Sequence, residues 1–425
     1  MVSTTCTTST LQQESQARRA ERTHRSSMLA GYANLLNTVV GGGILSLPYA
    51  FQSSGIVMGT VNQLAFGIAS WCGSFLLLDA LRLVNGRVNS YEDLAMLSLG
   101  RPGRLAYNLS ALINCYGACV SYMVAAADVI PSLLQEMGFT VGRAPALIGL
   151  TVLIVFPLST LHEISALRFA SGLAIVIYTM FAVTLGCLAA QAGTSPFSAS
   201  ATLLYATSPA DLIRAIPLCA FAFVHQTSLF PIYQEIHNPS PSRMQAIVTA
   251  AVGTAAAIYL FTSFAAVARF GSEIKGDILI NLGTIDSDFV RVIRLAFGIS
   301  LCLTFPCLHY AARRSLDQLV FGRRIGSTTP RTRLFALTCL LVGSSLCIAL
   351  AVERVEIVFG FTGAIASTML SYVLPAAIHL MCRPHRISDW RNNSGTLFYL
   401  TAGMCLGIVA LINHTYETVL SVRTG

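Results

Sequence analysis

Three consecutive glycines, Gly41, Gly42 and Gly43, lie near the middle of the hydrophobic stretch over residues 29–51. Each glycine disfavours a helix by about 1 kcal/mol relative to alanine, so three in succession indicate an unwound segment. Backbone N–H groups exposed at such a break can hold an anion. The alternative interpretation is that small residues allow neighbouring helices to pack closely. Because Asn34 and Asn37 also precede the glycines, we favour an anion-binding segment.

The hydrophobic stretch over residues 211–235 contains a second interruption. Pro217 and Pro231 bracket the polar run His-Gln-Thr-Ser at residues 225–228. A proline removes a helical hydrogen bond, and a polar run in apolar surroundings is costly unless its side chains face partners or water. A packed network of buried polar groups is the alternative. We predict a second helix break at this run.

The composition indicates what kind of protein carries these two breaks. Of the 425 residues, 54% are hydrophobic and 11% are charged, and the mean hydropathy is +0.66. A soluble domain carries roughly a quarter charged residues, so the chain is predicted to be an integral membrane protein. It has no metal-ligand spacing, nucleotide-binding loop or nucleophile motif, and we therefore expect no enzyme.

Apolar runs long enough to cross a bilayer predict an all-α fold of eleven transmembrane helices. They fall at about residues 29–51, 56–84, 105–133, 144–160, 166–190, 211–235, 244–270, 289–312, 333–352, 355–381 and 396–419. With the N-terminus in the cytoplasm, 19 of the 27 basic residues lie on the inner side. This bias predicts a cytoplasmic N-terminus and an extracellular or lumenal C-terminus.

The two interrupted helices are the first and the sixth, which are equivalent positions if the fold contains two repeats of five spans. A five-plus-five inverted repeat, with the substrate between two discontinuous helices, is typical of secondary transporters. We predict a polar cytoplasmic tail over residues 1–27 and a transporter domain over residues 28–420. The first repeat covers about residues 29–190, the second about 211–381, and the extra span about 396–419.

Three blocks of sequence resemble the amino acid/auxin permease family, in the branch of vacuolar amino acid transporters and sodium-coupled neutral amino acid transporters. Residues 34–50 are similar to its first-span pattern of Asn, a Gly-x-Gly-Ile-Leu core and a following Tyr-Ala. Residues 221–236 resemble the sixth-span pattern ending in Pro-Ile-Tyr-x-Glu-Leu, and residues 303–316 resemble the eighth-span pattern of Thr-x-Pro followed by Arg. The resemblance implies alternating access and cation-coupled transport of amino acids.

A zwitterionic amino acid requires one receptor for its carboxylate and one for its ammonium group. The N–H groups of Gly41, Gly42 and Gly43 suit the carboxylate. The carbonyl groups of Phe221, Ala222 and Phe223 suit the ammonium group, because the C-terminal end of a half-helix is electronegative. We expect His225, beside the second break, to face the variable group of the substrate.

Sodium prefers hard oxygen ligands. Asn37 shares a helix face with Gly41, so its amide oxygen and the carbonyls of Val40 and Gly41 are candidate ligands. The alternative for Asn37 is an interhelical hydrogen bond. Thr304 matches the family position whose hydroxyl helps to bind sodium, and its alternative is a hydrogen bond to the preceding turn. Because many relatives are proton-driven, the coupling cation is predicted to be either sodium or a proton.

The expected partners are an amino acid substrate, a coupling cation and the lipid bilayer, with no nucleic acid. Apart from a bound sodium ion, no cofactor is expected. The resemblance implies a multi-pass protein of the plasma membrane or of the vacuolar or lysosomal membrane. The alternative function is a membrane amino acid sensor that keeps the fold and the site but carries little flux.

Overall fold

The computed structural model describes residues 26–84, 88–136, 138–160, 168–192, 208–322, 329–383 and 390–424. Within these ranges all the regular elements are helices, and Ser26 and Ile236 form an isolated backbone bridge. Ten helical segments are long and apolar enough to cross a membrane, and a shorter apolar helix at Met28–Val40 precedes them. The predicted all-helical membrane fold is therefore confirmed. The tail predicted over residues 1–27 lies almost entirely outside the described residues.

The elements follow the predicted spans closely along the chain. They are α2 (Met28–Val40), α3 (Leu47–Ser54), α4 (Ile56–Leu83), α5 (Tyr91–Glu136), α6 (Arg143–Leu150), α7 (Phe156–Thr160), α8 (Arg168–Ala192), α10 (Pro209–Ala222), α11 (Gln226–Glu235), α12 (Pro241–Phe270), α13 (Ile278–Leu282), α14 (Asp288–Phe321), α15 (Arg331–Ala351), α16 (Val355–Thr362), α17 (Leu374–Cys382) and α18 (Trp390–Thr424).

The first span is split into two halves at the glycine run. The Ser27 hydroxyl caps α2 by accepting a hydrogen bond from the N–H of Ala30 at 3.1 Å. The α-helix ends at Val40, a short 3₁₀ turn covers Gly42–Leu45, and α3 begins at Leu47. The glycines therefore interrupt the helix where the sequence predicts it.

The sixth span is split in the same manner. The α10 helix ends at Ala222, the backbone leaves helical geometry at residues 223–225, and α11 begins at Gln226. Both prolines lie inside the helical halves, Pro217 in α10 and Pro231 in α11. The break therefore falls between the prolines, at the start of the polar run.

The third span is longer than predicted. The sequence places its start at about residue 105, whereas α5 begins at Tyr91 and bends at Gly100, whose φ of 70° is a backbone conformation that favours glycine. Pro102 follows the bend, and an ion pair between Arg104 and Glu92 at 2.8 Å joins its two sides. Glu92 and Arg104, which precede the predicted apolar run, thus pair with each other in a kinked helix.

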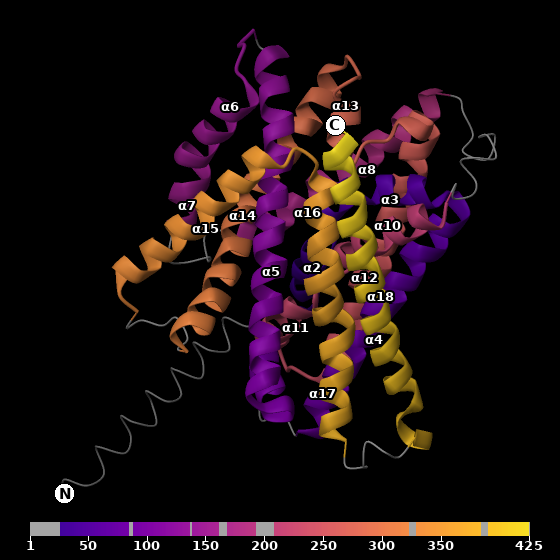
Figure 1. Ribbon diagram of the computed structural model, residues 1–425, viewed down its shortest axis with the longest axis vertical. Coiled ribbons are helices and arrows are strands. Elements are labelled where there is room, and N and C mark those ends of the chain that lie inside the picture. The colour runs from indigo at the N-terminus through magenta and orange to yellow at the C-terminus, as the bar shows by residue number, and fades with distance from the viewer. Residues whose placement is uncertain are drawn as a thin grey trace, which may run out of the picture.

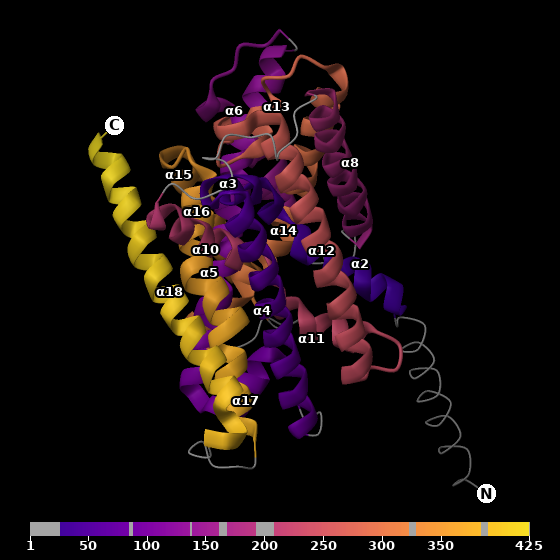
Figure 2. The same cartoon turned by 90° about the vertical axis from the view of Figure 1, so that its right-hand side faces the viewer.

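The long helices α5 and α14 lie side by side through the bundle, and α12 packs against α2, α4 and α8 (Figure 1). The last helix, α18, runs along one side of the bundle, where it contacts α10, α16 and α17 (Figure 2). The two breaks lie inside, between α12 on one side and the α5–α14 pair on the other.

Hydrogen bonds between side chains join the helices on the α12 side of the breaks. The Gln63 amide of α4 donates to the Ser263 hydroxyl of α12 at 2.8 Å. The Tyr32 hydroxyl of α2 donates to the Thr254 hydroxyl of α12 at 3.1 Å. Polar contacts in apolar surroundings fix the relative positions of helices, so α2 and α4 are both fastened to α12.

Candidate functional site

Both helix breaks border one cavity with a volume of about 320 Å³. The cavity lies between α2 and the second break on one side and α5 and α14 on the other. It is lined by these predicted site residues: Asn37, Gly41, Gly42, Gly43, Phe221 and Thr304. The predicted residues Val40, Ala222, Phe223 and His225 do not line it. Glu235, at the end of α11, has the one charged side chain among the described lining residues.

The glycine break makes close contacts that exclude larger residues. A Cβ atom on Gly43 would lie 2.8 Å from Cα and 2.9 Å from Cβ of Ala222, so the two breaks touch each other directly. A Cβ atom on Gly42 would collide with the ring of Tyr122 on α5. Real Cβ atoms do not approach other atoms so closely, which gives the glycines a steric role at this crossing.

The N–H group of Gly42 already has an acceptor. It donates to the Tyr122 hydroxyl at 2.9 Å, and Tyr122 itself lines the cavity with 5% of its surface exposed. This N–H is one of those predicted to bind a carboxylate. In the conformation described here, a tyrosine oxygen occupies the acceptor position.

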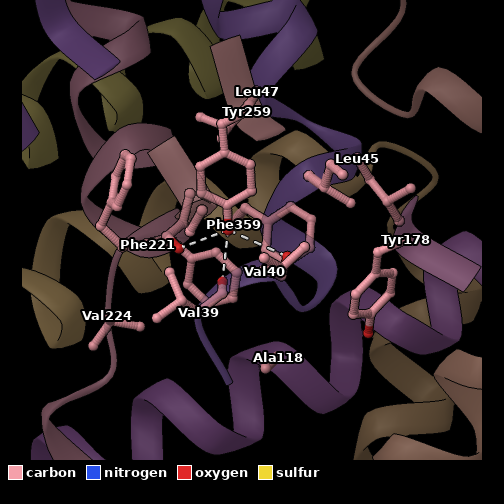
Figure 3. Close-up of a cluster of buried hydrophobic side chains, with 14 of the residues drawn as sticks. Val39, Val40, Leu45, Leu47, Ala118, Tyr178, Phe221, Val224, Tyr259 and Phe359 are labelled. Atoms are coloured by element: carbon pink, nitrogen blue, oxygen red, sulfur yellow. Dashed lines mark hydrogen bonds between the residues drawn. The ribbon is translucent and has the colours of Figure 1, made fainter. Parts of the chain in front are cut away.

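The hydroxyl of Tyr259 on α12 lies at the point where the two broken helices meet (Figure 3). It is 2.6 Å from the carbonyl oxygen of Val39, 3.0 Å from that of Ala222 and 3.2 Å from that of Val40. These carbonyls end the first halves of both interrupted helices. A tyrosine hydroxyl has a single proton to donate, so one donor serves three converging acceptors.

The predicted ammonium receptor is also partly occupied by the protein. The Ala222 carbonyl is close to Tyr259, and the Phe223 carbonyl accepts from the Ser70 hydroxyl at 2.6 Å and lies 2.9 Å from Nδ1 of His225. Of the three residues predicted for this receptor, Phe221 is the one that borders the cavity. Its ring packs on the ring of Phe359, with the ring centroids 4.5 Å apart.

His225 points away from the cavity and toward α4. Its side chain is completely buried, with Nε2 2.7 Å from the Ser74 hydroxyl. Because the Phe223 carbonyl can only accept, Nδ1 carries the hydrogen and Nε2 accepts from Ser74. The adjacent Gln226 donates to the Ser70 carbonyl at 3.1 Å and accepts from the Ser371 hydroxyl at 2.8 Å. These contacts form a buried polar network, which is the alternative considered for this run.

The two side chains proposed as cation ligands, Asn37 and Thr304, border the same cavity. The Thr304 hydroxyl donates to the Ser300 carbonyl one turn earlier at 2.8 Å. A hydroxyl that donates this bond can still accept a hydrogen bond or ligate a cation through its lone pairs. The buried hydroxyl of Tyr178 on α8 lies beside Thr304 and Ser300 and has no hydrogen bond of regular geometry to the described residues.

The sequence interpretation missed Tyr122, Tyr259 and Asn114, which shape the cavity or the crossing of the breaks. Asn114 lines the cavity, and its amide oxygen accepts from the Ser367 hydroxyl at 3.0 Å. Each of these residues stands in a long apolar span, where an isolated tyrosine or asparagine resembles an ordinary core residue. Only their position opposite the breaks distinguishes them.

The architecture resembles that of solved membrane transporters. The inward-facing conformation of Mhp1 has a TM-score of 0.58 and 13% sequence identity, covering 95% of this chain and 91% of that chain. MhsT in complex with L-phenylalanine also has a TM-score of 0.58 and 13% identity, covering 92% of this chain and 99% of that chain. These likenesses show the fold, which is that of a multi-pass helical membrane protein.

The family model for transmembrane amino acid transporter proteins matches residues 24–420, so the chain belongs to that family. The amino acid transporter AVT6A of Arabidopsis thaliana is 26% identical over 408 residues, covering 90% of this chain and 87% of the relative. Mouse solute carrier family 38 member 10 is 25% identical over 359 residues, covering 81% of this chain and 32% of the relative. The family confirms the predicted resemblance and places the chain among transporters, not enzymes.

Proposed function

We propose that this protein is a cation-coupled secondary transporter that binds an amino acid between its two broken helices and works by alternating access. The observation that carries the proposal is that both breaks border one cavity of about 320 Å³ inside the membrane-spanning part. Interrupted helices are tolerated at this depth where they are buried or line a cavity. Membership of the amino acid transporter family supports an amino acid as the substrate.

We also propose the five-plus-five inverted repeat. The segment from α2 to α3 and the ten longer segments together account for eleven spans, with the breaks in the first and the sixth. Spans one to five, over about residues 29–190, form the first repeat, and spans six to ten, over about 211–381, form the second. The position of α18 along one side of the bundle is consistent with an extra span outside both repeats.

In the proposed orientation the N-terminus is cytoplasmic and the C-terminus is extracellular or lumenal, in the plasma membrane or in a vacuolar or lysosomal membrane. The cavity extends from the breaks to α11 and the first half of span one. Because the span that contains α2 starts at the cytoplasmic face in this orientation, the cavity faces the cytoplasm. The conformation is then an inward-facing one.

The substrate carboxylate is proposed to bind the N–H groups of Gly41, Gly42 and Gly43, and its ammonium group the Phe221 carbonyl. The coupling site is proposed at Asn37, the Gly41 carbonyl and the Thr304 hydroxyl, because these three residues line the cavity. The Val40 carbonyl faces Tyr259 and is available to a cation only if that contact opens. Oxygen ligands of this kind favour sodium, and a proton is the alternative coupling ion.

Uptake into vesicles containing the purified protein tests the proposal. A tritiated mixture of the protein amino acids is supplied under an imposed sodium gradient, an imposed pH gradient, both, or neither. We expect one of the two gradients to drive accumulation of labelled amino acid above the level in vesicles with no imposed gradient. Saturable binding without flux under any gradient would favour the sensor, and neither binding nor flux would refute an amino acid site.

A further inference from the structure

Tyr122 contacts the glycine break through a hydrogen bond and also borders the cavity. Its hydroxyl accepts the Gly42 N–H at 2.9 Å and makes no other hydrogen bond to the described residues. The side chain is 5% exposed and borders the cavity, so there is space next to it. A single hydrogen bond and an adjoining cavity allow this side chain to leave its position at modest cost.

Tyr259 provides a contrast on the other side of the break. Its hydroxyl lies within 3.2 Å of three carbonyl oxygens, and the side chain is fully buried and does not border the cavity. We therefore treat Tyr259 as a fixed part of the crossing. Tyr122 is the tyrosine that a molecule entering the cavity can displace.

The Gly42 N–H requires a partner both with and without substrate. Where water is excluded, an unpaired backbone group inside a membrane protein costs several kcal/mol, and alternating access closes the cavity to water during each change of conformation. A secondary transporter that performs net transport must also change conformation with its substrate site empty. If the carboxylate of the substrate takes the Gly42 N–H in the loaded protein, another acceptor must take it in the empty one.

We propose that Tyr122 is a positioning residue whose hydroxyl replaces the substrate carboxylate at Gly42 when the site is empty and is displaced when substrate binds. This inference rests on the proposed function, because it requires a carboxylate at the glycine break. In the empty protein, α5 then supplies the hydrogen-bond acceptor for the glycine break through Tyr122. The hydroxyl and the substrate compete for the same N–H group.

The competition predicts opposite effects on two kinetic quantities. Tyr122→Phe removes the competing acceptor, so the half-saturating concentration of substrate should fall by about tenfold, the equivalent of one buried hydrogen bond. The same change leaves the Gly42 N–H without a partner in the empty protein. Net uptake at saturating substrate should therefore slow by about tenfold, whereas exchange, which proceeds through loaded states, should continue near the wild-type rate.

The experiment compares net uptake and exchange in vesicles containing the full-length protein. A tritiated amino acid mixture is supplied outside, and the vesicles contain either buffer alone or the same mixture unlabelled. Tyr372→Phe is the matched control, because the Tyr372 hydroxyl is buried, has no hydrogen bond to the described residues and does not border the cavity. Tyr122→Met, which also lacks the hydroxyl, serves if the phenylalanine variant does not fold.

The expected result is slow net uptake, preserved exchange and a lower half-saturating concentration for the Tyr122 variant, with the Tyr372 variant unchanged. An equal loss of net uptake and exchange in the Tyr122 variant, with a higher half-saturating concentration of substrate, would overturn the proposal and make Tyr122 a direct substrate ligand. Unchanged kinetics would also overturn it. If the wild-type protein shows neither net uptake nor exchange, the proposed function fails together with this inference. If the wild-type protein is active and the Tyr122 variant has the same ratio of net uptake to exchange, the inference alone is refuted.

Discussion

Removal of the Tyr259 hydroxyl tests how much the crossing of the two breaks depends on one atom. In Tyr259→Phe the ring remains, and the carbonyls of Val39, Val40 and Ala222 lose their shared donor. The contact of 2.6 Å to Val39 is the shortest of the three and identifies the main acceptor. The ring lies edge-on against Phe223, with centroids 5.1 Å apart, and this packing is retained.

The expected loss of stability in Tyr259→Phe follows from the fact that the Tyr259 hydroxyl has one proton to donate. One hydroxyl donates one full hydrogen bond, so at least one buried carbonyl loses its partner in the variant. Leaving a buried acceptor unpaired costs about 1–3 kcal/mol. A loss of this size corresponds to roughly 5-fold to 150-fold in the equilibrium between the correctly assembled crossing and its disrupted forms.

Thermal unfolding in detergent measures this loss. A thiol-reactive dye reports unfolding through the buried Cys115, Cys119 and Cys219. Tyr259→Phe should unfold at a lower temperature than wild type, whereas Tyr372→Phe, which removes a hydroxyl with no hydrogen bond to the described residues, should equal or exceed it. Equal destabilisation of both variants, or none in either, would refute the argument that the three carbonyls depend on the Tyr259 proton.

Four further predictions concern individual residues. Gly42→Val should abolish uptake and lower the amount of folded protein, because its Cβ would collide with the Tyr122 ring; normal expression with retained uptake would show that the break tolerates a side chain. Thr304→Ala should raise the half-saturating sodium concentration in uptake assays, and normal transport driven by a pH gradient alone would contradict a sodium site. His225→Ala should lower the amount of folded protein but leave the ranking of competing amino acids unchanged, since the side chain faces α4; an altered ranking would show substrate contact. Burial raises the pKa of Asp277 to about 8 from a usual value near 3.8, so folding favours its protonated form, and stability should fall as pH rises from about 4 to 8. Asp277→Asn should flatten this dependence in unfolding scans, and an unchanged slope would assign it to other groups.

The sequence predicts the spans and the positions of the breaks because hydropathy, glycine and proline act locally. Gly41–Gly43 and residues 223–225 interrupt the helices where the pattern indicates. The orientation of side chains at the breaks was not predictable in the same way. His225 is the last residue of the interrupted backbone, and the local pattern does not indicate whether its side chain faces the cavity or α4. The roles of Tyr122 and Tyr259 depend on contacts between spans far apart in the chain, which a local pattern does not contain.

The hydrogen bonds described above divide the bundle into parts of unequal stiffness. Tyr259 joins the ends of α2 and α10 to α12, Gln63 joins α4 to α12, and Ser70 joins α4 to the second break. On the opposite side, one side-chain hydrogen bond among the described residues joins the glycine break to α5, from the Gly42 N–H to the Tyr122 hydroxyl. Directional bonds resist sliding, whereas apolar surfaces and an open cavity do not. Any rocking motion of this molecule should therefore carry α2, α4, α10 and α12 together as a near-rigid body, with α5 and α14 as the surface over which they move.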